Sequence, residues 1–385
     1  MKKNIAVIFG SRSAEHDVSI ITAHVPIMNT LKTMSEYNVV PVYIAKDGSW
    51  YSFKELSDIK TFTAGRLDVK LKQEKKARLV FDNGLEIIVP GFRGTKVKID
   101  VAFPATHGTY GEDGSLMGLL RMANVPFVGC DIFASTIAMD KVLTKQVTMS
   151  AGLPSVKFVW FTASEWDSNQ ADVKKRIKTL KFPVFVKPAH LGSSIAITKV
   201  KSQSELENAL EVALHYDDKV LVEESVEDLI EVTVPIMGND EYKLALVEQP
   251  NAEFFDFDTK YMRGGKKGGG KKGGGKGGAN AGYSKLPADL PAKTMKEVQD
   301  LTKRTFAAIG GSGIARVDFL ISKKAHKVYV NEVNTLPGSL YEHNWRASGV
   351  SNVDLVRKLI TLAEERHAQQ QKLTTTFNSS FLQQF

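Results

Sequence analysis

The chain has 385 residues, of which 43% are hydrophobic and 24% are charged, and its formal net charge is +8. This is the composition of an ordinary soluble globular protein, and the length allows two or three domains with full cores. No apolar run approaches the roughly 18–20 residues that a membrane helix needs. The single cysteine, Cys130, excludes an intramolecular disulfide and a cysteine metal cluster, and it favours a cytoplasmic location.

Most of the positive charge lies in one segment. Residues 264–278 consist of ten glycines and five lysines, and these lysines with Arg263 account for six of the eight net charges. The rest of the chain is nearly neutral, so the net charge does not indicate a nucleic-acid partner. RNA binding by this segment is the alternative from another class of function. However, the segment contains no aromatic residue that could stack on a base.

Residues 1–139 predict an N-terminal α/β domain. Short apolar runs predict strands at residues 4–9, 39–45, 100–105 and 126–128. Helical patterns cover residues 17–31, with a kink at Pro26, and residues 115–123. Asp82-Asn83-Gly84 indicates a hairpin. This alternation of strands and helices is typical of a mostly parallel sheet.

Two further units and a tail follow. Residues 140–225 predict a small α+β domain with helices at 140–150 and 204–215 and strands at 184–187, 195–200 and 220–223. Residues 226–368 predict a C-terminal domain with strands at 231–237, 243–247 and 315–320, another ending at 334, and helices at 292–309 and 353–367. The remaining residues, 369–385, are rich in Gln, Thr and Ser, which is typical of a flexible tail.

A cluster of oxygen ligands is expected where two of these strands lie together. Residues 328–340 read V-Y-V-N-E-V-N-T-L-P-G-S-L, so Glu332 and Asn334 share one face of a strand that ends at a Pro-Gly turn. Arg316 and Asp318 have the same spacing in the preceding strand. Carboxylate and amide oxygens suit Mg²⁺, which often bridges substrate phosphates. The pattern indicates a nucleotide-dependent enzyme, and a surface hairpin with solvated side chains is the alternative.

Residues 107–118 read H-G-T-Y-G-E-D-G-S-L-M-G and follow a predicted strand. This motif resembles the signature of the D-alanine–D-alanine ligase family, H-G-x-x-G-E-D-G-x-x-Q-G, with Met117 in place of Gln. The resemblance extends over about residues 3–366 and includes motifs at 13–19, 139–141, 186–188, 192–194, 260–261, 316–318 and 331–334. It implies a three-domain ATP-grasp architecture with an N-terminal, Rossmann-like parallel-sheet domain. The chain departs from the family in the short turn at 337–340 and in the Gly/Lys segment, which stands in the place of the family's ω-loop (262–285).

The resemblance implies a ligase that joins two D-alanines for peptidoglycan precursor synthesis. ATP phosphorylates the carboxylate of the first D-alanine, and the amine of the second attacks the acyl phosphate. The implied ligands are ATP and two Mg²⁺ ions, with Mn²⁺ as an alternative. The implied partners are small-molecule substrates and a second copy of the chain, with no nucleic acid and no membrane insertion. D-lactate or D-serine as second substrate, or another amino-acid pair on an ATP-grasp ligase, are the alternatives.

The resemblance also assigns the nucleotide and metal sites. Lys141 and Lys187 hold the α- and β-phosphates, Lys260 faces the γ-phosphate, and Ser194 belongs to a glycine-containing loop that closes over them. The hinge that binds adenine runs from Glu223 through Glu224 to Val226, with Glu231 for the ribose hydroxyls. Asp318, Glu332 and Asn334 hold the metal ions.

The remaining assignments concern the amino acids. Glu15 binds the ammonium of the first substrate, although a charge at a helix N-terminus is its alternative reading. Ser193 and Tyr261 connect Glu15 to the ω-loop, and Tyr261 favours D-alanine as second substrate. His107 lies near the first carboxylate. Arg316 and the Gly338 backbone N–H stabilise the oxyanion, and Ser339 and Leu340 bind the second carboxylate.

Overall fold

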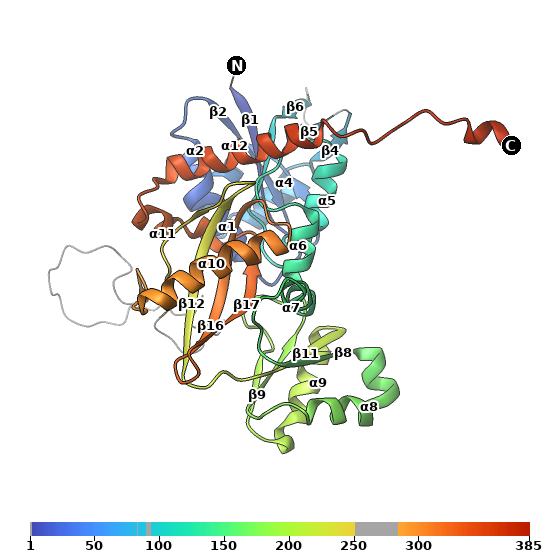
Figure 1. Cartoon of the computed structure of the whole chain (residues 1–385). Coiled ribbons are helices and arrows are strands. Elements are labelled where there is room, and N and C mark those ends of the chain that lie inside the picture. The colour runs from blue at the N-terminus through green and yellow to red at the C-terminus, as the bar shows by residue number, and fades with distance from the viewer. Residues whose placement is uncertain (1, 83, 90–93, 251–283) are drawn as a thin grey trace.

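The framework of the protein is a set of β-sheets covered by helices (Figure 1). The computed structural model describes residues 2–82, 84–89, 94–250 and 284–385. Within these ranges there are three four-stranded sheets, one three-stranded sheet and one two-stranded sheet. The mixed α/β class with an N-terminal parallel sheet is confirmed. The expected domain bounds, 1–139, 140–225 and 226–368, stay a prediction.

The N-terminal sheet has the order β3-β2-β1-β7. Its strands are β1 (Lys3–Gly10), β2 (Tyr37–Ile44), β3 (Trp50–Tyr51) and β7 (Val101–Pro104). The central strand, β1, pairs in parallel with β2 and β7, and every residue from Ile5 to Gly10 is buried. A continuous apolar strand of this kind is typical of a parallel sheet covered on both faces. The expected strand at 126–128 is reduced to one parallel bridge between Phe127 and Ala102.

The first helix runs as one unit through a change of helix type. It consists of α1 (His16–Thr22), a π-helical segment η1 (Ala23–Met28) and α2 (Asn29–Leu31). Pro26 lies inside the π segment. Proline has no N–H for an i→i−4 hydrogen bond, and a wider turn accommodates its ring. Where a kink was expected at Pro26, the structure has a local change from α-helical to π-helical winding.

A small antiparallel sheet and several helices complete this region. The hairpin is β4 (Arg78–Phe81) and β5 (Leu85–Val89), joined by β6 (Thr95–Ile99), a strand that sequence patterns did not predict. Asn83, at the turn, lies outside the described residues. The helices are η2 (Lys54–Ser57), α3 (Lys60–Thr63), α4 (Leu67–Gln73), α5 (Ser115–Met122) and α6 (Ile132–Met139).

The second sheet is antiparallel, with the order β10-β9-β11-β8. Its strands are β8 (Phe158–Thr162), β9 (Val184–Pro188), β10 (Thr198–Val200) and β11 (Lys219–Glu224). The helices are α7 (Lys141–Ser150), α8 (Ala163–Ile177), η3 (Gln203–Glu205) and α9 (Leu206–Tyr216). The sheet, α8 and α9 form the unit at the bottom of Figure 1, with α7 above them. Both β8 and α8 are additions to what the sequence predicted.

The third sheet has the order β13-β12-β16-β17. It consists of β12 (Leu229–Gly238), β13 (Lys243–Leu244), β16 (Gly313–Ser322) and β17 (Lys327–Asn334), and helix α10 (Ala292–Ala308) packs on it. A short pair, β14 (Gln249–Pro250) and β15 (Ser284–Lys285), lies beside β12. After β17 come η6 (Gly338–Tyr341) and α11 (Glu342–Ala347).

The last long helix, α12 (Asn352–Gln370), returns to the N-terminal region. It packs on α2 and β7, and its Leu355 and Leu359 join the same core cluster as Phe9 of β1 (Figure 1). Beyond Gln370 the chain extends away from the body and ends in η7 (Phe381–Gln384). Among the described residues, no helix is long and apolar enough to cross a membrane.

Arg366 of α12 fastens this helix to two other parts of the chain. Its guanidinium is buried and donates to the backbone oxygens of Phe127 and Gly129, at 2.7 and 2.6 Å, and to Ser312 Oγ at 2.8 Å. The same group lies over the Phe127 ring, 4.5 Å from its centre. The helix is thus tied both to the N-terminal region and to the residue before β16.

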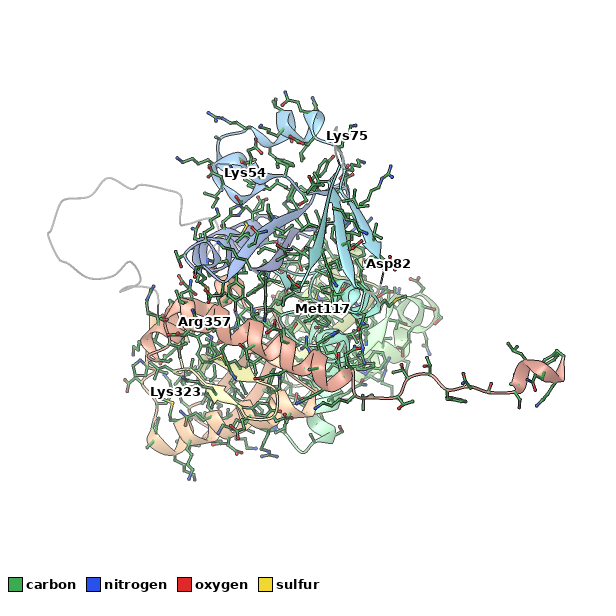
Figure 2. The ribbon with its side chains drawn as sticks, turned by 90° about the horizontal axis from the view of Figure 1, so that it is seen from above. Lys54, Lys75, Asp82, Met117, Lys323 and Arg357 are labelled. Carbon is green, nitrogen blue, oxygen red and sulfur yellow. The ribbon has the colours of Figure 1, made fainter. Side chains whose placement is uncertain are left out.

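We expect Arg366→Met to lower the free energy of unfolding by about 2–4 kcal/mol, because it leaves buried acceptors without a donor. The measurement is urea denaturation followed by circular dichroism. Arg357→Met, on the exposed side of the same helix, is the matched control (Figure 2). It removes an ion pair to Glu36 that is about half exposed on both sides and should cost no more than about 1 kcal/mol. Equal losses in the two variants would contradict the fastening role of Arg366.

Candidate active site

The antiparallel pairing of β16 and β17 collects the expected oxygen ligands. Asp318 stands opposite Glu332, and Arg316 stands opposite Asn334. The Asp318 carboxylate accepts two hydrogen bonds from Arg316 (Nε and Nη2, both 2.7 Å) and one from Asn334 Nδ2 at 3.2 Å. Thr233 of β12 donates a further one at 2.6 Å. The strands therefore bring the four predicted residues together, and Thr233 is an addition.

The chemistry of this cluster fits a divalent cation. Two carboxylates and an amide supply the hard oxygen atoms that Mg²⁺ prefers. Burial alone would lower the pKa of Arg316, but the charges of Asp318 and Glu332 hold it well above its ordinary value. Arg316 is consequently charged and neutralises Asp318. A metal ion here would have to share the Asp318 carboxylate with this guanidinium.

A buried ion triad lies in the second sheet. Glu223 of β11 pairs with Lys187 of β9 at 2.5 Å and with Lys145 of α7 at 2.8 Å, and the side chains of Glu223 and Lys145 are almost fully buried. Burial by itself raises the pKa of a carboxyl group, but the two ammonium groups outweigh it and lower the pKa of Glu223 to about 2. The carboxylate expected to bind adenine is thus a counter-ion to two lysines. Sequence reasoning missed Lys145. It could have been found from its position four residues after Lys141, which puts both lysines on one face of the helix.

Lys141, the first residue of α7, is the third buried amine. Its ammonium donates to the backbone oxygen of Leu191 at 2.6 Å, and its backbone N–H donates to Ala189 at 3.0 Å. Burial lowers its pKa and the nearby charge of Lys187 adds to this, whereas Glu332 opposes it. The lysines expected to hold phosphate therefore lie within electrostatic reach of each other and of the oxygen cluster. A polyanion is the ligand that would complement them.

Glu15 connects the N-terminal region to the second sheet. It precedes α1, and its carboxylate accepts a hydrogen bond from Ser193 Oγ, in the loop after β9. Gly108 and Gly192 lie against the same carboxylate, because a Cβ at either position would be 2.8 Å from Oε2 of Glu15. A side chain at either glycine would therefore require this carboxylate to shift. The expected pairing of Glu15 with Ser193 is present in the structure.

His107 belongs to a chain of hydrogen bonds that ends at the turn after β17. Its Nε2 lies 2.9 Å from Thr22 Oγ1, which accepts the Ser339 N–H at 2.9 Å. Its Nδ1 lies 3.8 Å from Glu112, and Glu112 accepts the Leu336 N–H at 3.1 Å. Burial lowers the pKa of His107, but Glu112 and then Glu15 outweigh burial and raise it. Thr22 and Glu112 are further residues that sequence reasoning gave no role.

The short turn at 337–341 has an unusual backbone. Ser339, Leu340 and Tyr341 all have φ between 50° and 53°, in the left-handed region that β-carbons disfavour. The Leu340 side chain is buried in the core, and its N–H donates to the Pro337 oxygen at 2.8 Å. The guanidinium of Arg316 lies over the Tyr341 ring, 5.2 Å from its centre. Gly338, Ser339 and Leu340, the residues expected at the oxyanion and the second carboxylate, precede Tyr341 in this turn.

Several predicted residues lie around this centre or outside the described chain. Glu224 accepts the Lys181 N–H at 2.9 Å, and Val226 follows β11. Burial lowers the pKa of Lys187, but Glu223, Glu332 and Glu231, the last on β12, outweigh burial and raise it. Ser194 follows Ser193 in the same loop. Lys260, Tyr261 and the Gly/Lys segment, with ω-loop residues 262–283, lie outside the described residues.

Met117, the departure from the family signature, lies in the interior of the molecule (Figure 2). Its side chain is fully buried in a cluster that includes Ile8, Val42 and Leu336. The methionine at this position thus extends an apolar core.

The parallel N-terminal sheet, the second sheet with its buried lysines and the third sheet with its oxygen ligands define an ATP-grasp ligase. Comparison with known proteins gives the family. A family model described as the D-ala D-ala ligase N-terminus matches residues 4–130, and one described as the D-ala D-ala ligase C-terminus matches residues 147–361. The chain belongs to the D-alanine–D-alanine ligase family.

Individual relatives agree over the full length. A D-alanine–D-alanine ligase of Thermoanaerobacter sp. (strain X514) is 36% identical, and the match covers 95% of this chain and 98% of the relative. One of Bacillus pumilus (strain SAFR-032) is 34% identical over 98% of this chain and 100% of its own. Among solved structures, the D-alanine-D-alanine ligase from Coxiella burnetii has a TM-score of 0.77 at 29% identity, covering 96% of both chains. The VanG D-Ala:D-Ser ligase from Enterococcus faecalis has a TM-score of 0.74 at 29% identity, covering 94% and 100%.

We expect Lys145→Met to lower the free energy of unfolding at pH 7 by about 3 kcal/mol, because it removes one partner of a buried carboxylate. The stabilisation that Glu223 gains from its lysines is complete above pH 4.5 and is lost as the pH falls toward 2. In the variant this acid-side loss should be smaller and should be complete at a higher pH, because the pKa of Glu223 is less depressed. Denaturant titrations between pH 3 and 7 measure both effects.

The matched control is Lys174→Met, which breaks an exposed pair with Glu207 and should cost no more than about 1 kcal/mol. The double variant Lys145→Met/Glu223→Gln should be more stable than the sum of its two single losses predicts. Strict additivity would show that Lys145 and Glu223 are not energetically coupled.

Proposed function

We propose that this protein joins two D-alanines to D-alanyl-D-alanine with ATP, through an acyl phosphate, for peptidoglycan precursor synthesis. One observation carries the proposal beyond family membership. The hydrogen bond between Ser193 and Glu15 places the phosphate-side loop directly against the carboxylate expected to bind the first amino acid. A nucleotide and an amino acid held on the two sides of this contact would have their reacting groups close together.

On the nucleotide side, the buried lysines neutralise the polyphosphate. Lys141 and Lys187 hold the α- and β-phosphates, with Ser194 in the covering loop and Lys260 at the γ-phosphate. The hinge formed by Glu223, Glu224 and Val226 binds adenine, and Glu231 binds the ribose. Lys145 keeps Glu223 paired when Lys187 turns toward phosphate, which reduces the cost of breaking the pair.

On the amino-acid side, the residues are assigned to the charged groups of the two amino acids and to the charge that develops in the reaction. Glu15 binds the first ammonium and is held by Ser193, with Tyr261 as the link to the ω-loop. His107 lies near the first carboxylate, and Thr22 joins it to the turn. Arg316 and the Gly338 N–H stabilise the negative charge that develops when the second amine attacks. The backbone at Ser339 and Leu340 receives the second carboxylate.

Asp318, Glu332 and Asn334 would hold two Mg²⁺ ions, or Mn²⁺ in their place. When bound, such ions neutralise the charge of the phosphoryl groups. The protein's own contribution is the alignment of these oxygens by the register of β16 and β17. Arg316, at the side of Asp318, adds a fixed positive charge at the same point.

The test is phosphate release from MgATP in the presence of D-alanine, L-alanine, D-serine plus D-alanine, and D-lactate plus D-alanine, with products identified by mass. Release that requires D-alanine and yields the D,D-dipeptide is the expected result. If D-Ala-D-Ser or D-Ala-D-Lac were the main product, the proposed reaction would stand but D-alanine as second substrate would be wrong. The likeness to a D-Ala:D-Ser ligase makes D-serine the first comparison.

Glu15→Gln should raise KM for the first D-alanine about 10- to 100-fold, because it removes a charged hydrogen-bond partner.

Asp17→Asn is the control for Glu15→Gln, since Asp17 lies in the same helical turn with its side chain 82% exposed. It should leave both KM and kcat within about twofold, the scale of a surface change. Absence of phosphate release with every amino acid offered would refute the proposed activity.

We further infer that the ligase is a cytoplasmic homodimer. Along the first helix, Met28 is fully buried in the core, whereas Ile21 and Val25 are about half exposed on neighbouring turns. A second copy packed on this face would remove both from water. Sedimentation velocity should show a dimer for the natural sequence and a monomer for Ile21→Asp. Val69→Asp, at an exposed apolar position elsewhere, should remain dimeric; a monomeric natural chain would contradict the inference.

A further inference from the structure

His190 lies between two carboxylates, in the loop that separates Lys187 from Ser193. Its Nδ1 is 2.8 Å from Oδ1 of Asp217, and its Nε2 is 3.3 Å from Oδ2 of Asp140. Its backbone N–H also donates to Asp217, at 2.6 Å. Ionised carboxylates only accept hydrogen bonds, so both ring nitrogens donate and the ring is an imidazolium.

Both carboxylates belong to elements that carry the phosphate site. Asp140 is the N-cap of α7, and its Oδ1 accepts the backbone N–H groups of Val142 and Leu143 at 2.8 and 3.1 Å. The next residue is Lys141. Asp217 precedes β11, the strand that carries Glu223. His190 therefore joins the exit of β9, the start of α7 and the entry to β11 at one point.

The chain neighbours of His190 bind Lys141 directly. The oxygen of Ala189 accepts the Lys141 backbone N–H, and the oxygen of Leu191 accepts the Lys141 ammonium. The three consecutive residues 189–191 thus contact the start of α7 through three groups, the oxygens of Ala189 and Leu191 and the His190 ring. Any shift of this loop would move Lys141 relative to Lys187.

The charges around the ring favour its protonated form. Asp140 faces it from α7, and Asp217 and Asp218 face it from the turn before β11. Lys219, at the start of β11, donates to the same Asp140 oxygen at 2.6 Å, and Lys141 follows Asp140 on α7. The hydrogen bonds to Asp140 and Asp217 outweigh burial and raise the pKa of His190 to about 9. A ring that donates from both nitrogens cannot ligate a metal, although His190, Asp217 and Asp218 lie within coordinating distance of one another.

We propose that His190 is a positioning residue for the nucleotide: as a doubly bonded imidazolium, it fixes the loop between Lys187 and Ser193 onto the N-terminus of α7. It thereby sets the separation of the two lysines that receive the phosphates. This role rests on the proposed function of Lys141 and Lys187. In this role His190 acts through Lys141 and Lys187.

A pH dependence follows with a definite sign. A histidine whose pKa is raised by folding contributes stabilisation that is fully present below pH 6.5 and is lost as the pH rises through about 9. The affinity for nucleotide should therefore weaken across that window, when the ring loses its second donor. The opposite sign, tighter binding of nucleotide at alkaline pH, would argue against the positioning role of His190.

The test uses the full-length protein and MgADP as the probe, with Kd measured by calorimetry from pH 7 to 10. His190→Gln keeps a polar side chain but cannot titrate. We expect it to weaken Kd about 10- to 100-fold at pH 7.5, the effect of losing a hydrogen bond between charged groups. Its Kd should lack the inflection near pH 9 that the natural sequence shows. Equal Kd values, or the same pH profile in both proteins, would overturn the proposal.

Two controls separate positioning from general damage. His215→Gln changes an exposed histidine of α9 in the same unit and should leave the Kd profile unchanged. In turnover assays His190→Gln should raise KM for ATP with kcat within about threefold, since it alters binding and not the reacting groups. A fall in kcat alone would contradict the role.

A third measurement needs no stable variant. The ring carbon–proton signal of His190 in the natural protein, followed by NMR, should titrate with a midpoint near 9. A midpoint near 6.5 would show that the ring is not held as an imidazolium and would overturn the proposal. If the protein binds MgADP with the expected profile but releases no phosphate with D-alanine, the proposed ligase function fails and the positioning role of His190 stands. If it binds no MgADP, both fail.

Discussion

The register of β16 against its two neighbours determines where the polar groups of the third sheet lie. Thr233 of β12 and Glu332 of β17 both stand opposite Asp318, and Arg316 and Asp318 share one face because they are two residues apart. Between them, Val317 faces the apolar core. A slip of one residue would turn the arginine and the carboxylate into that core and expose the valine. The burial of the core and the alignment of the oxygen ligands are therefore enforced by the same hydrogen-bond pattern.

Around this sheet the protein buries more charge than a structural scaffold requires. Lys141, Lys145 and Lys187 are all withdrawn from water, and Glu223 is the carboxylate that pairs with two of them. Desolvating ammonium groups costs free energy that a single ion pair does not recover. The cost is consistent with a site that binds a polyanion, because an incoming phosphate chain gains from cations that are already desolvated and fixed. The buried lysines thus lower the stability of the free protein and add to the free energy of binding a polyanion.

Local patterns predicted the parts of the fold whose periodicity is strong. The strands around Arg316, Asp318 and Glu332 alternate clearly, and β1 is a continuous apolar run, so both were foreseen. Helix α6 was missed because Ile132–Met139 is apolar on nearly all sides and shows no polar face. The residues of the site could be named because several motifs resemble one family. The contact of Glu15 with Ser193, 178 residues apart, was also implied by that resemblance. The pairing of Lys145 with Glu223 was not predicted, nor were the partners of His190, which come from two other elements. Such pairings depend on how whole sheets pack, which spacing along the chain does not encode.

The return of α12 to the N-terminal region has a consequence for the order in which the chain can fold during synthesis. The core around Phe9, Ile27 and Phe103 is closed by Leu355, Leu359 and Ile360, which are made long after it. At roughly 5–20 residues per second, the first strands wait on the order of 20–70 s for the helix that covers them. Throughout that interval the nascent chain exposes an apolar sheet face. We therefore expect the ribosome-bound intermediate to bind chaperones. Removal of α12 would leave the N-terminal core uncovered.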